Sequence, residues 1–358
     1  MSEEYILGDC IKKMSKIKDN SIDMIFADPP YNLQLSKSLL RPDQTNVKGV
    51  NHDWDKFNSF EAYDKFTINW LKEARRILKK NGTIWIIGSY HNIYRVGTAI
   101  QNLGFWILND IIWNKSNPMP NFKGNRFTNA HETIIWASHN QKSKYTFNYK
   151  AMKVLNDDKQ MRSDWSLPIC SGKERIKDSG KTLHPTQKPE SLLHRIIISS
   201  TLPGDKILDP FFGTGSTGAM AKKLGRNFIG IEKDIKYMTF AKKRIKLIKP
   251  LKNEDLSITK NPQKEIKIPF GSLLDNGMLK IGAKLHDINK KHNATIRADG
   301  SLLVNKEVEG SIHKAGAKIQ GYNACNGWEY WHYEENGKLV SINKLREKIR
   351  NNNKTIIN

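Results

Sequence analysis

The segment KILDPFFGTGSTGAMAKKLGRNFIGIEKD, residues 206–234, constrains the fold more than any other part of the sequence. A short apolar run ends on Asp209, and a glycine-rich turn follows it. A helix is then predicted over Ser216–Leu224, and a second apolar run ends near Glu232. In such a unit the glycines let the backbone approach a nucleotide-like ligand, and the terminal acid can bond ribose hydroxyls. The segment therefore predicts neighbouring parallel strands with a ligand at their carboxyl ends.

Strand-like apolar runs alternate with amphipathic helices elsewhere in the first 250 residues, which is typical of a doubly wound, mostly parallel α/β sheet. The predicted strands are Tyr5–Leu7, Ile22–Ala27, Thr83–Gly88, Trp106–Trp113, Glu132–Ala137, Lys206–Leu208 and Phe228–Ile231. A long helix is predicted over Phe60–Lys79, with a stop at Asn81-Gly82.

A second unusual strand end lies in SIDMIFADPPYN, residues 21–32. The apolar run stops on Asp28, two prolines and Tyr31. Pro29 and Pro30 lack an amide hydrogen and fix their own backbone, so this turn is stiff. The sequence therefore predicts a rigid cluster of a carboxylate, carbonyl oxygens and a ring.

The glycine spacing alone leaves other interpretations open. Gly213-x-Gly215-x-x-Gly218 fits the dinucleotide fingerprint, so a nicotinamide-dependent enzyme is one alternative, and a purely structural tight turn is another. A dinucleotide enzyme, however, has no evident use for Asp-Pro-Pro-Tyr at a neighbouring strand end. The pair of motifs is thus more informative than either motif alone.

The charge balance indicates a polyanionic partner. The 358 residues include 59 Lys and Arg against 36 Asp and Glu, which gives a net charge of +23. Such an excess favours nucleic acid, although a basic, AT-biased proteome would also produce it. The three cysteines are scattered without a CxxC pair, so neither disulfides nor a metal site is expected. No apolar run approaches the length of a membrane span and no signal peptide opens the chain, so we expect a soluble, cytosolic protein.

Composition divides the chain into three parts. Residues 1–250 form the predicted α/β domain, 251–269 a polar linker, and 270–351 a small separate module with aromatics and glycine turns. Within the first part, periodicity is lost over 115–181, where thirteen Lys and Arg face six Asp and Glu. A long irregular stretch of this kind is typical of a functional insertion, and its aromatics favour an ordered one.

The two strand-end motifs together resemble the amino-group DNA methyltransferases that use S-adenosylmethionine. Asp28-Pro29-Pro30-Tyr31 precedes Phe211-x-Gly213-x-Gly215, which is the motif order of their permuted β group. The resemblance implies a Rossmann-like methyltransferase sheet with an inserted target-recognition region at about 115–181, and a small C-terminal α+β domain.

Further motifs resemble the cell-cycle-regulated adenine methyltransferases and their GANTC-modifying relatives. These are GDC at 8–10, HPTQKPESLL at 184–193 and LDPFFGTGSTG at 208–218, while NACNGWEYW in the tail is similar to their RAMA domain. The resemblance spans nearly the whole chain. It implies methylation of adenine N6 in double-stranded DNA, within GANTC, by a homodimer that is cytoplasmic and nucleoid-associated.

The resemblance gives the first motif a chemical role. The lone pair of adenine N6 is conjugated into the ring, so the amine is a poor nucleophile. Asp28 and the Pro29 carbonyl can each accept one of its N–H groups and hold it within about 3–3.5 Å of the reacting methyl. Tyr31 would stack on the base, and Pro30 would help to keep the turn rigid. The adenine must be flipped out of the duplex to reach this turn.

Cofactor contacts are implied at the other motif and at two flanking positions. Glu232 should hold the ribose hydroxyls, and Asp209 and Lys188 the two ends of the methionine moiety. Asp9 resembles the acid beside the cofactor adenine, although a helix N-cap before Ile11 would explain it equally well. The complete set is Asp9, Asp28, Thr186, Lys188, Asp209, Phe211, Gly213, Gly215, Ser216 and Glu232.

DNA contacts are expected from the basic insertion, because Arg and Asn can bond base edges while most lysines meet phosphates. The candidates are Arg41, Lys115, Asn121, Lys123, Arg126, Arg162 and Trp165. For any single Lys or Arg, a solvated surface position is the alternative. In the tail we expect contacts from Lys314, Lys318, Trp328, Tyr330 and Trp331, and the alternative is that these aromatics form the core of a small domain.

Three other functions remain open from the sequence. Cytosine-N4 enzymes usually carry Ser at the position of Asp28, and RNA enzymes more often carry Asn there. The third alternative is an inactive DNA-binding module. Intact Asp28, Tyr31, Gly213 and Glu232 argue against that alternative, because an inactive protein would be free to lose them.

Overall fold

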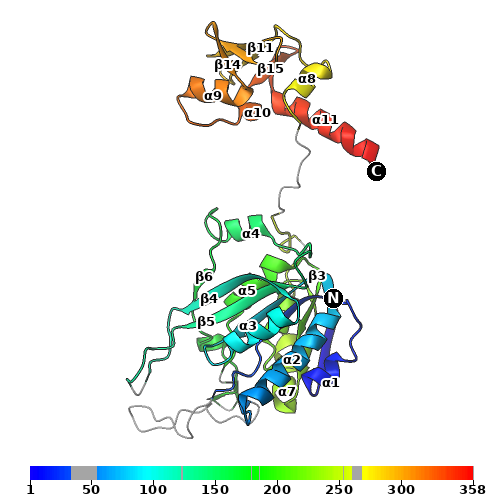
Figure 1. Ribbon diagram of the computed structural model, residues 1–358, viewed down its shortest axis with the longest axis vertical. Helices are drawn as coiled ribbons and strands as arrows, with labels where there is room; N and C mark the ends of the chain where they lie inside the picture. The colour runs from blue at the N-terminus through cyan, green and yellow to red at the C-terminus, as the bar shows by residue number, and fades with distance from the viewer. Residues whose placement is uncertain are drawn as a thin grey trace. The chain divides into compact units, whose positions relative to one another are not determined.

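The computed structural model describes residues 1–33, 55–121, 124–178, 180–184, 186–252, 254–259 and 268–357. The chain divides into two compact units, Met1–Asn261 and Pro262–Asn358, and each unit has its own sheet (Figure 1). No helix of the described residues is long and apolar enough to span a membrane.

The first unit is built on an eight-stranded sheet of order β1-β10-β9-β2-β3-β5-β4-β6. Its parallel part contains β1 (Glu3–Leu7), β10 (Asn227–Glu232), β9 (Lys206–Asp209), β2 (Ile22–Ala27) and β3 (Leu78–Gly88). Beyond β3 lie β5 (His131–Ser138), β4 (Trp106–Lys115) and β6 (Asp164–Leu167). Strand β5 runs antiparallel to both β3 and β4, so it begins at the sheet edge where those two strands end.

Helices cover both faces of this sheet and create two hydrophobic cores. They are α1 (Cys10–Met14), α2 (Phe60–Ile77), α3 (Ile93–Asn102), α4 (Tyr149–Val154), α5 (Glu190–Ser200), α6 (Ser216–Lys223) and α7 (Ile235–Lys246). Along β2, Met24 and Phe26 belong to the core under α5–α7, while Ile25 and Ala27 belong to the core under α1–α3. This alternation follows from the two-residue repeat of a strand buried on both faces. The doubly wound, mostly parallel α/β fold predicted from the sequence is confirmed.

One predicted boundary is wrong. Helix α2 begins after the N-cap Ser59 and ends at Ile77, but Asn81-Gly82 is no turn, because both residues lie inside β3. Gly82 serves a close approach instead: a Cβ there would lie 2.9 Å from the carbonyl oxygen of Asp23. A glycine within a strand often marks such a contact rather than a chain reversal.

The predicted insertion over 115–181 is only partly separate from the sheet. Its residues supply the end of β4 and all of β5 and β6, so those stretches are sheet strands and not an inserted region. The remainder contains α4, a 3-10 helix (Gly172–Glu174) and the two-stranded ribbon β7 (Lys177–Asp178) and β8 (Lys181–Thr182). The predicted strand Glu132–Ala137 is confirmed as β5, whereas β6 was not predicted because it is only four residues long and follows a long polar loop.

The described residues of the second unit form a six-stranded antiparallel sheet and four helices. The strands are β14 (Glu307–Gly310), β13 (Leu302–Val304), β12 (Asn293–Ile296), β11 (Lys284–His286), β15 (His332–Glu335) and β16 (Lys338–Ser341). The helices are α8 (Gly271–Asp275), α9 (Ile312–Gln320), α10 (Gly327–Tyr330) and α11 (Ile342–Ile357).

Trp328 and Trp331 belong to the core of this unit and are buried. The indole of Trp331 donates to the carbonyl oxygen of Ile312 at 2.9 Å, and Tyr330 packs edge-on against its ring. The predicted DNA contacts of the two tryptophans are therefore wrong, because a small domain needs large rings to fill its interior.

Candidate active site

A cavity of about 650 Å³ lies at the carboxyl ends of the parallel strands of the first unit. It brings together most of the predicted site residues, namely Asp9, Asp28, Pro29, Pro30, Tyr31, Thr186, Phe211, Gly213 and Glu232. An adjoining hollow of about 30 Å³ is lined by Lys188, Asp209 and Ser216. Gly215 lines neither space. A Cβ there would lie 2.8 Å from that of Ala241, so this glycine serves the packing of α6 on α7.

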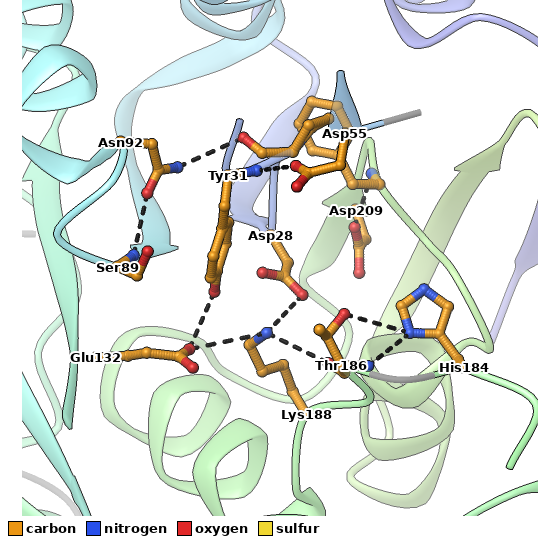
Figure 2. Close-up of polar contacts among 12 residues, drawn as sticks. Asp28, Tyr31, Asp55, Ser89, Asn92, Glu132, His184, Thr186, Lys188 and Asp209 are labelled. Carbon is orange, nitrogen blue, oxygen red and sulfur yellow. Dashed lines mark hydrogen bonds and ion pairs between the residues drawn. The ribbon is translucent and has the colours of Figure 1, made fainter. Parts of the chain in front are cut away.

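The turn after β2 is held by a carboxylate that the sequence analysis missed. Asp55 Oδ1 accepts from the backbone amides of Tyr31 at 2.5 Å and Asn32 at 2.9 Å, and its Oδ2 accepts from that of Leu33 at 3.0 Å (Figure 2). Asn32 has a φ of +54°, which requires such support in a non-glycine residue. Asp55 therefore fixes the backbone that carries the Tyr31 ring.

The same turn is held from its other side. The Tyr63 hydroxyl donates to the Pro30 carbonyl at 2.9 Å, and Asn92 Nδ2 donates to the Tyr63 hydroxyl at 3.1 Å. No described residue donates to the Pro29 carbonyl. The turn is thus clamped at both ends, and the Pro29 carbonyl stays available as an acceptor.

Asp28 itself has one engaged oxygen and one unengaged oxygen. Its Oδ2 accepts from the Lys188 ammonium at 2.8 Å, whereas the buried Oδ1 has no partner among the described residues. Burial raises the pKa of the Asp28 carboxyl, while Lys188 opposes this effect and the charge of Glu132 adds to it. The Tyr31 hydroxyl also lowers the pKa of Asp28, but it donates to Glu132 at 3.0 Å. Within the described part of the chain, the site therefore presents a buried carboxylate oxygen, Asp28 Oδ1, that has no partner at hydrogen-bond geometry.

Lys115 is not a DNA contact in this structure. Its ammonium lies 2.8 Å from Glu132 Oε1, and the two side chains are only 12% and 11% exposed. Burial raises the pKa of Glu132, but Lys188 and Lys115 lower it by more, so the net shift is downward. The prediction for Lys115 is wrong because the sequence did not reveal the buried carboxylate at the start of β5.

The glycine-rich turn is organised by the acid at the end of β10. Glu232 Oε2 accepts from the amide of Gly213 at 2.7 Å, and Oε1 accepts from that of Asp234 at 2.8 Å. Asp9 caps α1 by accepting from the Lys12 amide at 3.0 Å, so the N-cap interpretation is confirmed, although Asp9 also lines the cavity.

Asp209 is buried in the adjoining hollow and accepts from the Phe211 amide at 2.9 Å. It makes no ion pair within the described part of the chain, and burial raises its pKa to about 7. A buried carboxylate of this kind is a ready partner for a cationic ligand group.

The remaining DNA candidates differ in their surroundings. Arg126 is exposed and donates to the Tyr90 hydroxyl at 2.8 Å, and Asn121 donates to the Arg126 carbonyl. Arg162 is exposed and paired with Asp164. Arg41 and Lys123 lie outside the described residues.

Trp165 was also predicted to contact DNA, and the structure contradicts this. Its side chain is 4% exposed and packs beside Trp85 in the core, while its indole donates to the Arg162 carbonyl at 2.8 Å. The prediction failed because a short strand such as β6 can lie within a polar stretch and still place an aromatic side chain in the hydrophobic core.

The fold and the site define a class of enzyme. A nucleotide-type turn at the end of β9 and an acceptor-rich Asp28–Tyr31 turn at the end of the adjacent β2 line one cavity, as a methyltransferase acting on amino groups requires.

Comparison with known proteins identifies the family. The DNA methylase family (N6_N4_Mtase) matches residues 22–243, and the Restriction Enzyme Adenine Methylase Associated (RAMA) domain matches residues 250–355. The chain belongs to the DNA methylase family, and it is a DNA methyltransferase with a C-terminal RAMA domain.

Two curated relatives are similar over most of their length. The chain is 52% identical over 345 residues to the Type II methyltransferase M.HinfI of Haemophilus influenzae, which covers 96% of each chain. It is 50% identical over 240 residues to the Type II methyltransferase M2.DpnII of Streptococcus pneumoniae, which covers 66% of this chain and 87% of that one.

Solved structures share the fold of the first unit. The crystal structure of the M1.HpyAVI–SAM complex matches with a TM-score of 0.50 and 31% identity over 68% of this chain and 100% of that chain. The cytosine-N4-specific PvuII DNA methyltransferase matches with a TM-score of 0.54 and 20% identity over 72% of this chain and 90% of that chain. At 20% identity, the match to the PvuII enzyme supports the Rossmann-like fold and nothing further.

Proposed function

We propose that this chain transfers a methyl group from S-adenosylmethionine to N6 of a flipped-out adenine in double-stranded DNA. The observation that carries the proposal is the buried Oδ1 of Asp28, which has no hydrogen-bond partner among the described residues and lies in the turn that lines the cavity. A buried carboxylate oxygen without a donor is costly for a folded protein, and an amino group of a substrate would satisfy it.

The two free acceptors of the turn suit an exocyclic amine. Asp28 Oδ1 and the Pro29 carbonyl would each accept one N–H of adenine N6, which draws the nitrogen toward tetrahedral geometry and aims its lone pair at the methyl carbon. With the cofactor bound, the nitrogen–carbon bond would form as the carbon–sulfur bond breaks, S-adenosylhomocysteine would leave, and the cationic amine would lose its extra proton to water. The Tyr31 ring, held at its hydroxyl by Glu132, would stack on the base.

The cavity residues fit S-adenosylmethionine as the methyl donor. When bound, its sulfonium supplies an activated methyl group. Asp209, which is buried and without an ion-pair partner among the described residues, would accept from the cofactor ammonium. Glu232 ends β10 in the cavity lining and would accept from the ribose hydroxyls. Gly213 lines the cavity with a φ of +51°, so the backbone can approach the ligand there.

We infer that the target sequence is GANTC. We also infer that the protein functions as the cell-cycle-regulated adenine methyltransferases do. This inference rests on the resemblance of HPTQKPESLL and LDPFFGTGSTG to the motifs of those enzymes. The same resemblance supports a homodimer that acts in the cytoplasm and associates with the nucleoid through DNA binding. Arg126 and Asn121 stay proposed DNA contacts, because they lie together on the loop between β4 and β5.

The proposed function is tested by transfer of a tritiated methyl group to synthetic duplexes. We expect label in a duplex with one GANTC site, and none when guanine replaces the adenine on both strands of that site or when RNA of the same sequence is supplied. Label that persists without the adenine would instead support cytosine-N4 transfer, and absence of label from every duplex would support an inactive DNA-binding module.

A further inference from the structure

A cluster of four charged side chains, two buried and two partly buried, surrounds the catalytic turn, and Asp28 is the member that contacts the target amine in the proposed chemistry. The other members are Lys188, which precedes α5, Glu132, the second residue of β5, and Lys115, the last residue of β4 (Figure 2 shows Asp28, Lys188 and Glu132). Because β5 runs antiparallel to its neighbours, its first residues reach the edge where the other strands end. The reversed direction of β5 thus places a second carboxylate, that of Glu132, near Asp28.

Glu132 makes three polar contacts with its two oxygens. Oε1 lies 2.8 Å from the Lys115 ammonium, and Oε2 accepts from the Tyr31 hydroxyl at 3.0 Å. Oε2 also lies 3.8 Å from the Lys188 ammonium, which bonds Asp28 Oδ2 at 2.8 Å. The two carboxylates and two ammonium groups balance in charge. Such balance is needed in the interior, because removing one partner leaves the others uncompensated.

The Tyr31 hydroxyl has two acceptors to choose from. Hydrogen bonding by this hydroxyl lowers the pKa of the Asp28 carboxyl, while the hydroxyl lies 3.0 Å from Glu132 Oε2, to which it donates. If it donated to Asp28 Oδ1 instead, it would occupy the oxygen that the substrate amine needs. Glu132 prevents this competition, and it also fixes the plane of the ring on which the base would stack.

We propose that Glu132 is a positioning residue for methyl transfer, which holds the Tyr31 hydroxyl and the Lys188 ammonium so that Asp28 Oδ1 stays free for the target amine. This inference rests on the proposed function. It assigns Lys115 the supporting task of orienting Glu132 through Oε1.

The test compares single and double variants in methyl transfer to the GANTC duplex. In Glu132→Gln the side chain keeps its shape but has one oxygen, so it cannot accept from both Lys115 and Tyr31. We expect kcat to fall about tenfold or more, with the dissociation constant for S-adenosylmethionine within about threefold of wild type. In the Glu132→Gln background, Tyr31→Phe removes the competing donor and is expected to leave kcat unchanged or raise it, whereas Tyr31→Phe alone lowers kcat.

The pH profile gives a readout that a merely structural role would not move. The groups facing Asp28 are Lys188, Glu132, Tyr31 and the neighbouring Asp209. Glu132 raises the pKa of Asp28, so its neutralisation should lower that pKa and move the acid limb of the kcat profile to lower pH.

The controls separate this inference from the proposed function. Glu73→Gln removes an ion-paired glutamate of α2 that lies outside the cavity lining and is expected to leave kcat and the profile unchanged. Should Glu132→Gln fail to fold, Glu132→Asp keeps the buried charge but is one methylene too short for both contacts, and it is expected to lower kcat about fivefold or more. Wild-type kcat in the folded variant, or an additive loss on adding Tyr31→Phe, would overturn the inference, whereas an inactive wild type would overturn the proposed function itself.

Discussion

Replacement of Asp55 should reduce methyl transfer although this carboxylate takes no part in the proposed chemistry. It accepts from the amides of Tyr31, Asn32 and Leu33, and that of Asn32 belongs to a buried residue. The other two amides can turn to water more readily. Leaving one buried amide without a charged acceptor costs about 3 kcal/mol. If this cost destabilises the turn conformation that is competent for methyl transfer, Asp55→Ala should lower kcat about a hundredfold.

The assay is single-turnover methyl transfer at saturating S-adenosylmethionine and duplex, with the cofactor dissociation constant measured separately. Asp55→Asn keeps one oxygen for the two amides that share Oδ1, so we expect it to lose only about tenfold. Asp64→Asn is the matched control, because Asp64 of α2 pairs with Arg95 of α3 and lies outside the cavity lining. If Asp55→Ala keeps kcat within about twofold of wild type, the turn does not depend on this clamp and the reasoning is refuted.

Three further predictions concern the cofactor and the DNA. Burial raises the pKa of Asp209 to about 7, and the ionised form would bind the cofactor ammonium. Affinity for S-adenosylmethionine should therefore fall about tenfold for each pH unit below 7, which titration calorimetry of the wild type would measure. The same pH dependence in Asp209→Asn would refute the assignment. The net charge of +23 predicts that log affinity for DNA falls steeply and linearly with log salt, and a flat dependence would show that the charge does not meet phosphates. Truncation at about residue 260 should keep cofactor binding but weaken DNA binding about tenfold, or about 1.4 kcal/mol, through loss of Lys314 and Lys318; unchanged DNA affinity would assign the second unit another role.

The parts of the site that are contiguous in sequence could be predicted. A strand followed by Asp28-Pro29-Pro30-Tyr31, and another followed by a glycine turn, each carry their geometry locally, and both line the cavity. Glu232 likewise ends the strand on which it was predicted.

Residues brought in by long-range topology could not be predicted. Glu132 reaches the site because β5 runs antiparallel to β3, and the local sequence does not indicate the direction in which a strand pairs. Lys115 looked like a surface charge for the same reason, since its partner lies on the neighbouring strand. Asp55 is joined to the turn by backbone amides that have no sequence signature.

Aromatic residues in polar stretches were the other source of error. Trp165 and Trp331 occur among charged and polar residues, as a nucleic-acid contact would, yet both fill cores. A ring buries a large apolar area wherever a short strand or a small domain needs it, so composition alone does not decide between the two positions.

The central claim is that Asp28 presents a free carboxylate oxygen to adenine N6, and its most direct test is the identity of the methylated nucleoside. A GANTC duplex incubated with S-adenosylmethionine and either wild type or Asp28→Ala would be digested to nucleosides and analysed by mass spectrometry. We predict N6-methyladenine with wild type and none with Asp28→Ala, whose cofactor affinity stays within about threefold because the carboxylate acts mainly in the transition state. N4-methylcytosine as the product, or near-normal N6-methyladenine from Asp28→Ala, would contradict the claim.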